Sequence, residues 1–430
     1  MPKAGCSKSR RPAGRNSLST GTAASPSADR PWPLTMTNRN RKSPSTAPIP
    51  PRTARHAPFT PKRNSQMTQP SMEKDTLRTT IDNVAAAFSR LKGIQEGLVS
   101  DGSDGKIQFD EWDWEVGVGL YGFLRRALAA NDQKALDDLV TWYGWQIDRG
   151  LPPRQINSSA PMLPLVILTE HVDRPDFRAL VEDWADWLVH ELPKTEDGGF
   201  QHVVKERLNE GELWDDTLFM ACLFLARAGV VCKRQDWIDE AVYQFMIHAR
   251  YLSDPVTGLW YHGWTFNGRH NFADAFWARG NSWITVAIPE LFELVPTLAG
   301  KDKRFLANVL SSQVRSLRKY QREDGMFHTL LDDPTSPVET SATAGIAYGI
   351  LRGIEAGILG EENRPHAERA LKAVLGNIDD EGVVHGVSDG TPMGHDLDFY
   401  RRIPNLPTPY GQALTMLLLI DVFLKRPKAS

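Results

Sequence analysis

Hydrophobic residues recur every three or four positions from about residue 75 to the C-terminus, and the strict alternation typical of strands is scarce. This periodicity predicts an all-helical protein. We expect twelve helices, over 75–98, 111–130, 133–149, 159–171, 177–192, 212–229, 234–251, 274–297, 302–321, 339–357, 364–377 and 408–425.

The predicted loops repeat one pattern, in which an acid and a glycine precede a hydrophobic residue and a histidine. Its glycines, Gly198, Gly258, Gly325 and Gly382, are 60, 67 and 57 residues apart, the length of two helices with their connections. Each repeat is therefore expected to be one helical hairpin. Six hairpins could form an open solenoid or close into an (α/α)6 barrel. We expect closure, because several of the loops are longer than the regular turns of a solenoid.

Residues 1–66 show no such periodicity and are rich in Pro, Ser, Thr and Arg. A segment of this composition cannot bury enough apolar surface to offset the entropy of ordering, so we expect it to be disordered. An Arg-rich, acid-poor start is also typical of an organelle transit peptide. We favour another interpretation, in which 1–66 is translated upstream sequence, the natural start is Met67 or Met72, and 67–430 forms one catalytic domain.

The net charge of −3 hides an asymmetry, because residues 1–66 hold 13 Lys or Arg against one acid. This +12 leaves −15 for the remainder, so no nucleic acid partner is expected. Three cysteines without a CxxC pair favour a reducing compartment over a disulfide framework. No apolar run is long enough for a membrane span, and no secretory signal is visible. We expect a cytoplasmic protein that binds no membrane, and the oligomeric state is left open.

Asp215 and Asp216 open a strongly periodic segment that ends ahead of Gly229. Asp216 shares a helical face with Met220 and Leu223, so its carboxyl group is expected to face inward. Burial would raise its pKa, as a general acid working near neutral pH requires, whereas the adjacent helix N-terminus would lower that pKa. Acids also favour the first helical turn for structural reasons alone, and for Asp215 that interpretation stands beside a functional one.

Aromatic and polar residues are interleaved in 260–264 and again in 277–283. Carbohydrate sites combine aromatic faces, which stack on sugar C–H surfaces, with side chains that give directed hydrogen bonds. Arg279 could bind a carboxylate bidentately, which would suit an acidic sugar. The alternative is that these tryptophans are core residues. The histidines of the repeated turns lie too far apart in sequence to predict a metal site, so we expect neither a metal nor another cofactor.

The chain resembles glycoside hydrolase family 105, the unsaturated rhamnogalacturonyl hydrolases, with family 88 as a more distant relative. The resemblance covers roughly residues 75–425 and rests on several separated motifs in the family's order. They lie at 112–122, 157–161 (Asn-Ser-Ser-Ala-Pro), 213–220 (Leu-Trp-Asp-Asp-Thr-Leu-Phe-Met), 261–264 (Tyr-His-Gly-Trp), 277–283, 339–344 and 409–411.

The resemblance implies an (α/α)6 barrel and a small acidic oligosaccharide substrate, left by a polysaccharide lyase, whose terminal uronic acid carries a C4=C5 double bond. It also implies that an aspartic acid donates a proton to C4, and that the resulting carboxylate helps a water add at C5. The hemiketal then opens and releases the remaining sugar. One residue serves as acid and then as base, so no second catalytic carboxylate is required.

Within 213–220 the resemblance places the catalytic role on Asp216 and a variable position at Asp215. His262 matches the family's substrate-contacting histidine, and Asn157 stands where some relatives carry a second important aspartate. The complete set that we expect to bind substrate is Trp112, Asn157, Asp215, His262, Trp264, Trp277, Arg279, Asn281 and Trp283.

Two alternatives remain open at this point. Another (α/α)6 enzyme, such as an ordinary glycosidase or a sugar epimerase, would share the fold, and a glycosidase would need a second carboxylate, for which Asp113, Glu339 and Asp396 are candidates. A helical-repeat protein without catalysis would instead present an open concave surface.

Overall fold

The computed structural model describes residues 74–90, 111–205 and 207–425, so the predicted disorder of 1–66 lies outside the described residues. The α-helices are α1 (Lys74–Arg90), α2 (Trp114–Ala130), α3 (Gln133–Arg149), α4 (Met162–Leu168), α5 (Pro175–His190), α6 (Leu223–Cys232), α7 (Gln235–Leu252), α8 (Ala278–Leu294), α9 (Gly300–Tyr320), α10 (Thr340–Glu355), α11 (Arg364–Leu375), α12 (Leu397–Arg401) and α13 (Pro409–Lys425). Short elements are η1 (Asn157–Ser159), η2 (Leu218–Cys222), η3 (Glu361–Asn363), β1 (Glu212–Trp214), β2 (Gly263–Thr265), β3 (Phe327–His328) and β4 (Val338–Glu339).

Each predicted helix has a counterpart, and the predicted all-helical class is confirmed apart from two pairs of very short strands. The prediction was wrong at the start of 212–229, where β1 pairs antiparallel with β2 before the chain turns into η2, a single π-helical turn. It also missed α12 inside the long loop 386–407. Both departures depend on contacts with distant segments, which helical periodicity does not report.

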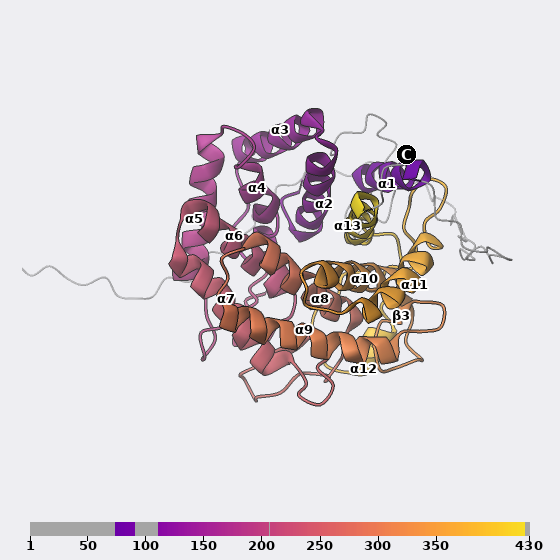
Figure 1. Ribbon diagram of the computed structural model, residues 1–430. Helices are drawn as coiled ribbons and strands as arrows, with labels where there is room; N and C mark the ends of the chain where they lie inside the picture. Colours follow the sequence, from indigo (N-terminus) through magenta and orange to yellow (C-terminus); the bar gives the residue numbers. More distant parts are fainter. Residues whose placement is uncertain (1–73, 91–110, 206, 426–430) are drawn as a thin grey trace, which may run out of the picture. The chain divides into compact units, whose positions relative to one another are not determined.

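The helices alternate between two layers, and this alternation follows the predicted hairpins. The inner helices α2, α4, α6, α8, α10 and α13 each contact the next, and α13 also contacts α2 and α1. Figure 1 shows the yellow α13 beside the indigo α1, so the last described helix lies against the first. The helices α1, α3, α5, α7, α9 and α11 lie outside them. Among the described helices, none is both long and apolar enough to span a bilayer.

The repeated turns place their glycines in a backbone conformation that other residues adopt with strain. Gly198, Gly258, Gly325 and Gly382 have φ values of 78°, 76°, 95° and 84°. A Cβ at Gly325 would lie 2.3 Å from the backbone oxygen of Arg369 on α11, and one at Gly382 would lie 2.3 Å from the backbone of Asn83 on α1. Each turn therefore packs on a later outer helix, and the last packs on the first helix of the described chain.

Close approach of the inner helices depends on small residues at their contacts. On α10, a Cβ at Gly349 would lie only 2.2 Å from the backbone oxygen of Thr285 on α8. We therefore expect Gly349→Ala to lower the free energy of unfolding by about 1–3 kcal/mol, because the helices must separate to admit the methyl group. Gly300→Ala is the matched control, since nothing lies within 4 Å of the added carbon. Equal denaturation midpoints for the two variants would contradict this account of the packing.

A buried charge network lies near the C-terminal end of α8. Glu290 is fully buried and accepts hydrogen bonds from the hydroxyls of Tyr121 on α2 and Tyr348 on α10. It also pairs with Arg125 at 3.2 Å and Arg352 at 3.5 Å. Burial raises the pKa of Glu290, but the two arginines and two tyrosines outweigh burial and lower it, so the carboxylate stays ionised. The network therefore joins three inner helices, α2, α8 and α10.

Candidate active site

The pairing of two short strands assembles the centre of the site. Trp214 of β1 lies opposite Gly263 of β2, and the backbone N–H of Asp215 donates to the carbonyl of His262 at 3.1 Å. Asp216 follows at once, and its carbonyl accepts the N–H of Met220 at the start of η2. Residues 215, 216 and 262 are thereby brought together, and the last two are the residues to which the resemblance assigned catalysis and substrate contact.

Asp216 is the member of this group that reaches solvent. Its side chain is 16% exposed, whereas that of His262 is 2% exposed. Nε2 of His262 lies 3.7 Å from Oδ2 of Asp216, and neither atom has a hydrogen-bond partner among the described residues. Burial raises the pKa of Asp216, but its contacts with His262, His202 and Asp215 outweigh burial and bring that pKa to about 2.

Asp215 is fully buried, and neither of its oxygens has a hydrogen-bond partner among the described residues. Its carboxyl group lies against Gly280 of α8, where a Cβ would come within 2.0 Å of Oδ2. Burial and the charge of Asp216 raise the pKa of Asp215 well above its ordinary value. For Asp216 the sequence analysis set burial against the helix N-terminus; in the structure it is the pKa of Asp215 that burial raises, which favours one proton in the pair, on Asp215.

His202, which the sequence analysis did not assign to the site, completes this group. Its Nδ1 lies 2.8 Å from Oγ1 of Thr217, and its ring stacks on Trp214 with centroids 4.4 Å apart. Burial lowers the pKa of His202 to about 3, so the ring is neutral near pH 7. The repeated turn pattern contained His202, but only the folded chain shows that it lies beside His262.

The carboxyl groups of Asp215 and Asp216 and the ring of His262 offer ligand-type atoms within 4.8 Å of one another. This spacing admits a cation as well as a shared proton. The complete burial of Asp215 favours the shared proton, because a cation would need further oxygen ligands such as water. The expectation of no metal from the sequence stays a prediction.

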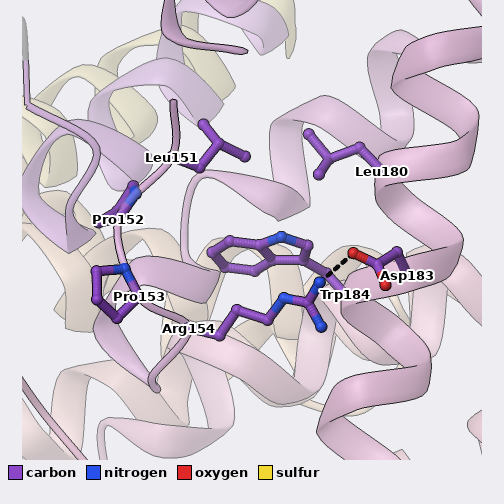
Figure 2. Close-up of a pocket in the computed structure, with 7 residues that line it drawn as sticks. All are labelled: Leu151, Pro152, Pro153, Arg154, Leu180, Asp183 and Trp184. Atoms are coloured by element: carbon purple, nitrogen blue, oxygen red, sulfur yellow. Dashed lines mark hydrogen bonds and ion pairs between the residues drawn. The ribbon is translucent and has the colours of Figure 1, made fainter. Parts of the chain in front are cut away.

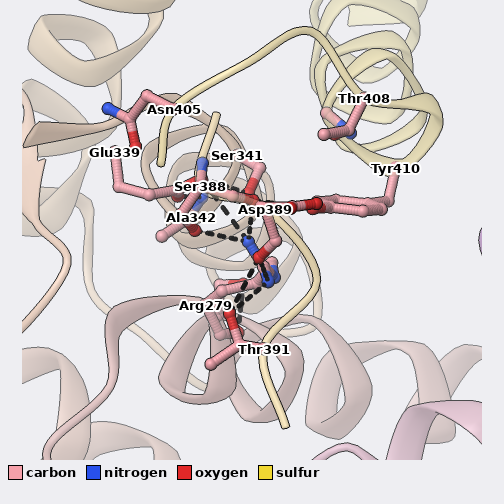
Figure 3. A network of polar contacts seen from close by, with 12 residues as sticks. Arg279, Glu339, Ser341, Ala342, Ser388, Asp389, Thr391, Asn405, Thr408 and Tyr410 are labelled. Atoms are coloured by element: carbon pink, nitrogen blue, oxygen red, sulfur yellow. Dashed lines mark hydrogen bonds and ion pairs between the residues drawn. The ribbon is translucent and has the colours of Figure 1, made fainter. Parts of the chain in front are cut away.

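Arg279 is buried, and both of its terminal nitrogens are occupied by the loop that follows Val387. Nη1 donates to the carbonyl of Ser388 at 2.8 Å and to its hydroxyl at 2.6 Å, and Nη2 donates to the carbonyl of Asp389 and the hydroxyl of Thr391, both at 2.9 Å (Figure 3). Glu339 lies 3.7 Å from the guanidinium. The predicted bidentate grip on a substrate carboxylate would require these bonds to break, so the structure supports a different role, in which Arg279 holds the loop.

Three other residues predicted to bind substrate have packing roles. Trp112 is 6% exposed, stacks on Trp142 and donates to the carbonyl of Ser158 at 2.7 Å. Asn281 and Trp283 are fully buried, and the side-chain amide of Asn281 bonds the backbone of Trp260 in both directions. Substrate contact by these three residues stays a prediction, and their burial does not favour it. For the two tryptophans, burial fits the alternative that they are core residues.

The remaining predicted residues are Trp277, Trp264 and Asn157. Trp277 packs on His262 with ring centroids 4.2 Å apart, and Trp264 is a half-buried residue of β2. Asn157 opens η1, which contacts η2, and its half-buried side-chain amide makes no hydrogen bond to the described residues. Contact of these three side chains with substrate stays a prediction.

The three acids considered as a second catalytic carboxylate are all used as helix caps. Asp113 caps α2, Glu339 caps α10 and Asp396 caps α12, each by accepting a backbone N–H. Glu115, in the first turn of α2, is different, because burial and the charges of nearby acids raise its pKa to about 8. Glu115 lies in the 112–122 motif, but the sequence analysis assigned it no role.

A surface pocket of about 500 Å³ lies between the segment 151–154 and α5. Figure 2 shows its lining, in which Trp184 forms the floor and Arg154 pairs with Asp183. The lining residues are Leu151, Pro152, Pro153, Arg154, Leu180, Asp183 and Trp184. None of the predicted site residues is among them, so this pocket is separate from the candidate active site.

Comparison with known proteins agrees with this geometry. The family model "Glycosyl Hydrolase Family 88" matches residues 92–425. The chain is 31% identical over 314 residues to the unsaturated rhamnogalacturonyl hydrolase YesR of Bacillus subtilis, covering 72% of this chain and 89% of that protein. A structure from Salmonella enterica serovar Paratyphi A, described as a possible member of the GH105 family, matches with TM-score 0.77 and 38% identity, covering 85% of this chain and 98% of the other.

A second structure with the same description, from Klebsiella pneumoniae, has TM-score 0.78 and 38% identity and covers 86% of this chain and 98% of the other. The relatives are thus matched over nearly their whole length. The chain belongs to the glycoside hydrolases of family 105, which are related to family 88, and it is an enzyme of that group.

Proposed function

We propose that this enzyme hydrolyses oligosaccharides that end in an unsaturated uronic acid, by hydrating the C4=C5 enol ether, with Asp216 as the acid and then the base. The observation that carries the proposal is the Asp215–Asp216 pair, in which one carboxyl group is sealed in the core and the other reaches solvent beside His262. The name of the similar Bacillus subtilis protein supports the substrate class.

A proton held on Asp215 and transferred to Asp216 explains how a carboxyl group with a low pKa can act as an acid, since ligand-type oxygens of the two groups lie within 4.8 Å of each other. Asp215 passes its proton to Asp216. Asp216 then donates that proton to C4, and the electron pair of the C4=C5 double bond forms the new C4–H bond and leaves C5 cationic. A water then adds at the cationic C5, and its proton goes to the carboxylate of Asp216 or, through it, back to Asp215. The hemiketal opens, the remaining sugar leaves, and the pair ends with one proton, as it began.

We also infer that the twelve layered helices close into an (α/α)6 barrel. The support is the contact of α13 with both α1 and α2, together with the last repeated turn, which packs on α1. Arg279, near the start of α8, lowers the pKa of both Asp215 and Glu115, so the starts of α8 and α2 lie near Asp215, as they would in a closed ring.

The substrate class can be tested with purified enzyme and oligosaccharides from lyase digests of acidic polysaccharides. We expect ultraviolet absorbance of the enol ether to decay with at least one digest, because hydration removes the double bond. The control is the same oligosaccharide after its C4=C5 double bond has been reduced to a single bond. This saturated oligosaccharide should remain intact. Release of sugar from the saturated control at a similar rate would contradict the proposal and favour an ordinary glycosidase.

A further inference from the structure

Tyr400 of α12 is a buried residue whose hydroxyl lies within hydrogen-bond distance of His262. Its Oη lies 2.7 Å from Nδ1 of His262 and accepts the N–H of Gly394 at 3.2 Å. Burial raises the pKa of Tyr400, so the hydroxyl keeps its proton near pH 7. The loop that carries Tyr400 is the one held by Arg279.

The direction of the bond between Tyr400 and His262 follows from counting donors. If Nδ1 carried the ring proton, Oη would accept two N–H groups and its own proton would need another acceptor. Within the described chain, the only other recorded acceptor for it is the sulfur of Met393 at 3.9 Å, and a thioether accepts weakly. The hydroxyl therefore donates to Nδ1, and the neutral ring carries its proton on Nε2.

That proton faces the proposed catalytic residue. Nε2 of His262 lies 3.7 Å from Oδ2 of Asp216, and both atoms are buried without a partner among the described residues. This distance is too long for a hydrogen bond and too short for a bridging water. A small movement of the Asp216 carboxylate would bring the two atoms within hydrogen-bond distance. The His262 ring is packed against Trp277 and Trp214, with centroids 4.2 Å and 5.4 Å away, which keeps Nε2 aimed at this carboxylate.

We propose that Tyr400 is a positioning residue, which fixes His262 as the tautomer with its proton on Nε2 so that this N–H stabilises the Asp216 carboxylate formed after proton transfer. The proposal rests on the proposed role of Asp216. An N–H that is held in place before the reaction favours the charged product of the acid step and costs little reorganisation.

The first test is direct and does not depend on activity. Nitrogen-15 NMR of histidine-labelled enzyme near pH 7, with His262→Gln to assign the signals, should show Nδ1 of His262 as an unprotonated, hydrogen-bonded nitrogen and Nε2 as protonated. In Tyr400→Phe the Nδ1 signal should move to the position of a nitrogen without a donor. A protonated Nδ1 in the unsubstituted enzyme would overturn the proposal.

The second test separates positioning from loop stability. Tyr400→Phe should lower kcat about tenfold and change KM less than twofold, because Tyr400 acts through His262 and not on the substrate. Tyr410→Phe is the matched control, since its buried hydroxyl donates to the carbonyl of Ser388 at 2.6 Å and holds the same loop without touching His262. Both variants should lose similar stability, but only Tyr400→Phe should shift the His262 nitrogens.

Equal shifts in the two variants, or an unchanged kcat in Tyr400→Phe, would overturn the positioning role. Failure of the proposed function has a different signature. In that case Asp216→Asn would keep its activity, while the His262 nitrogens would still show the expected tautomer.

Discussion

Asp216→Asn is expected to lower kcat on an unsaturated uronyl oligosaccharide by about 10³-fold, within the range that a lost general acid–base group produces. An amide has nearly the shape of the carboxyl group but cannot give a proton to C4 or take one from water. Asp216 makes no side-chain hydrogen bond of normal length to the described residues, so the midpoint of thermal unfolding should change little. The measurement is the initial rate of absorbance loss at saturating substrate.

Glu115→Gln is the matched control for this experiment. Glu115 is the other partly exposed carboxyl group in this region with a strongly shifted pKa, and an ordinary glycosidase would need such a second acid. We expect Glu115→Gln to retain kcat within a fewfold of the unsubstituted enzyme. A loss as large as that of Asp216→Asn would reassign the mechanism to a pair of carboxyl groups.

Glu290→Ala is expected to lower the free energy of unfolding by about 3–5 kcal/mol, the cost of removing one partner from a buried ion pair. The substitution leaves the Tyr121 and Tyr348 hydroxyls without their acceptor and leaves Arg125 and Arg352 with reduced compensation for their burial. Because the network joins α2, α8 and α10, the loss should lower the midpoint of the whole unfolding transition. Chemical denaturation followed by circular dichroism measures it.

Glu293→Ala provides the comparison for the network. Glu293 lies on the same helix and pairs with the same two arginines, but its side chain is 45% exposed. An exposed ion pair contributes about 0–1 kcal/mol, so this variant should remain close to the unsubstituted enzyme. If the two variants were equally destabilised, burial of Glu290 would not be what gives the network its strength.

Features that depend on neighbours along the chain could be predicted from sequence patterns. Helical periodicity located twelve helices, and the spacing of the turn glycines showed that they come in hairpins, because side-chain burial on a helix repeats every three or four residues. The resemblance carried by 213–220 also singled out Asp216.

The way in which these parts act together depends on contacts that form in the folded chain. Tyr400 meets His262 across 138 residues of sequence, and Arg279 reaches Ser388 across 109, so no local pattern could predict either contact. Burial also decided which of the two adjacent aspartates has the raised pKa, because the packing of Gly280 against Asp215 seals that carboxyl group from water while Asp216 remains partly exposed. Protonation state depends on solvation and on nearby charges in space, and neither can be read from order along the chain.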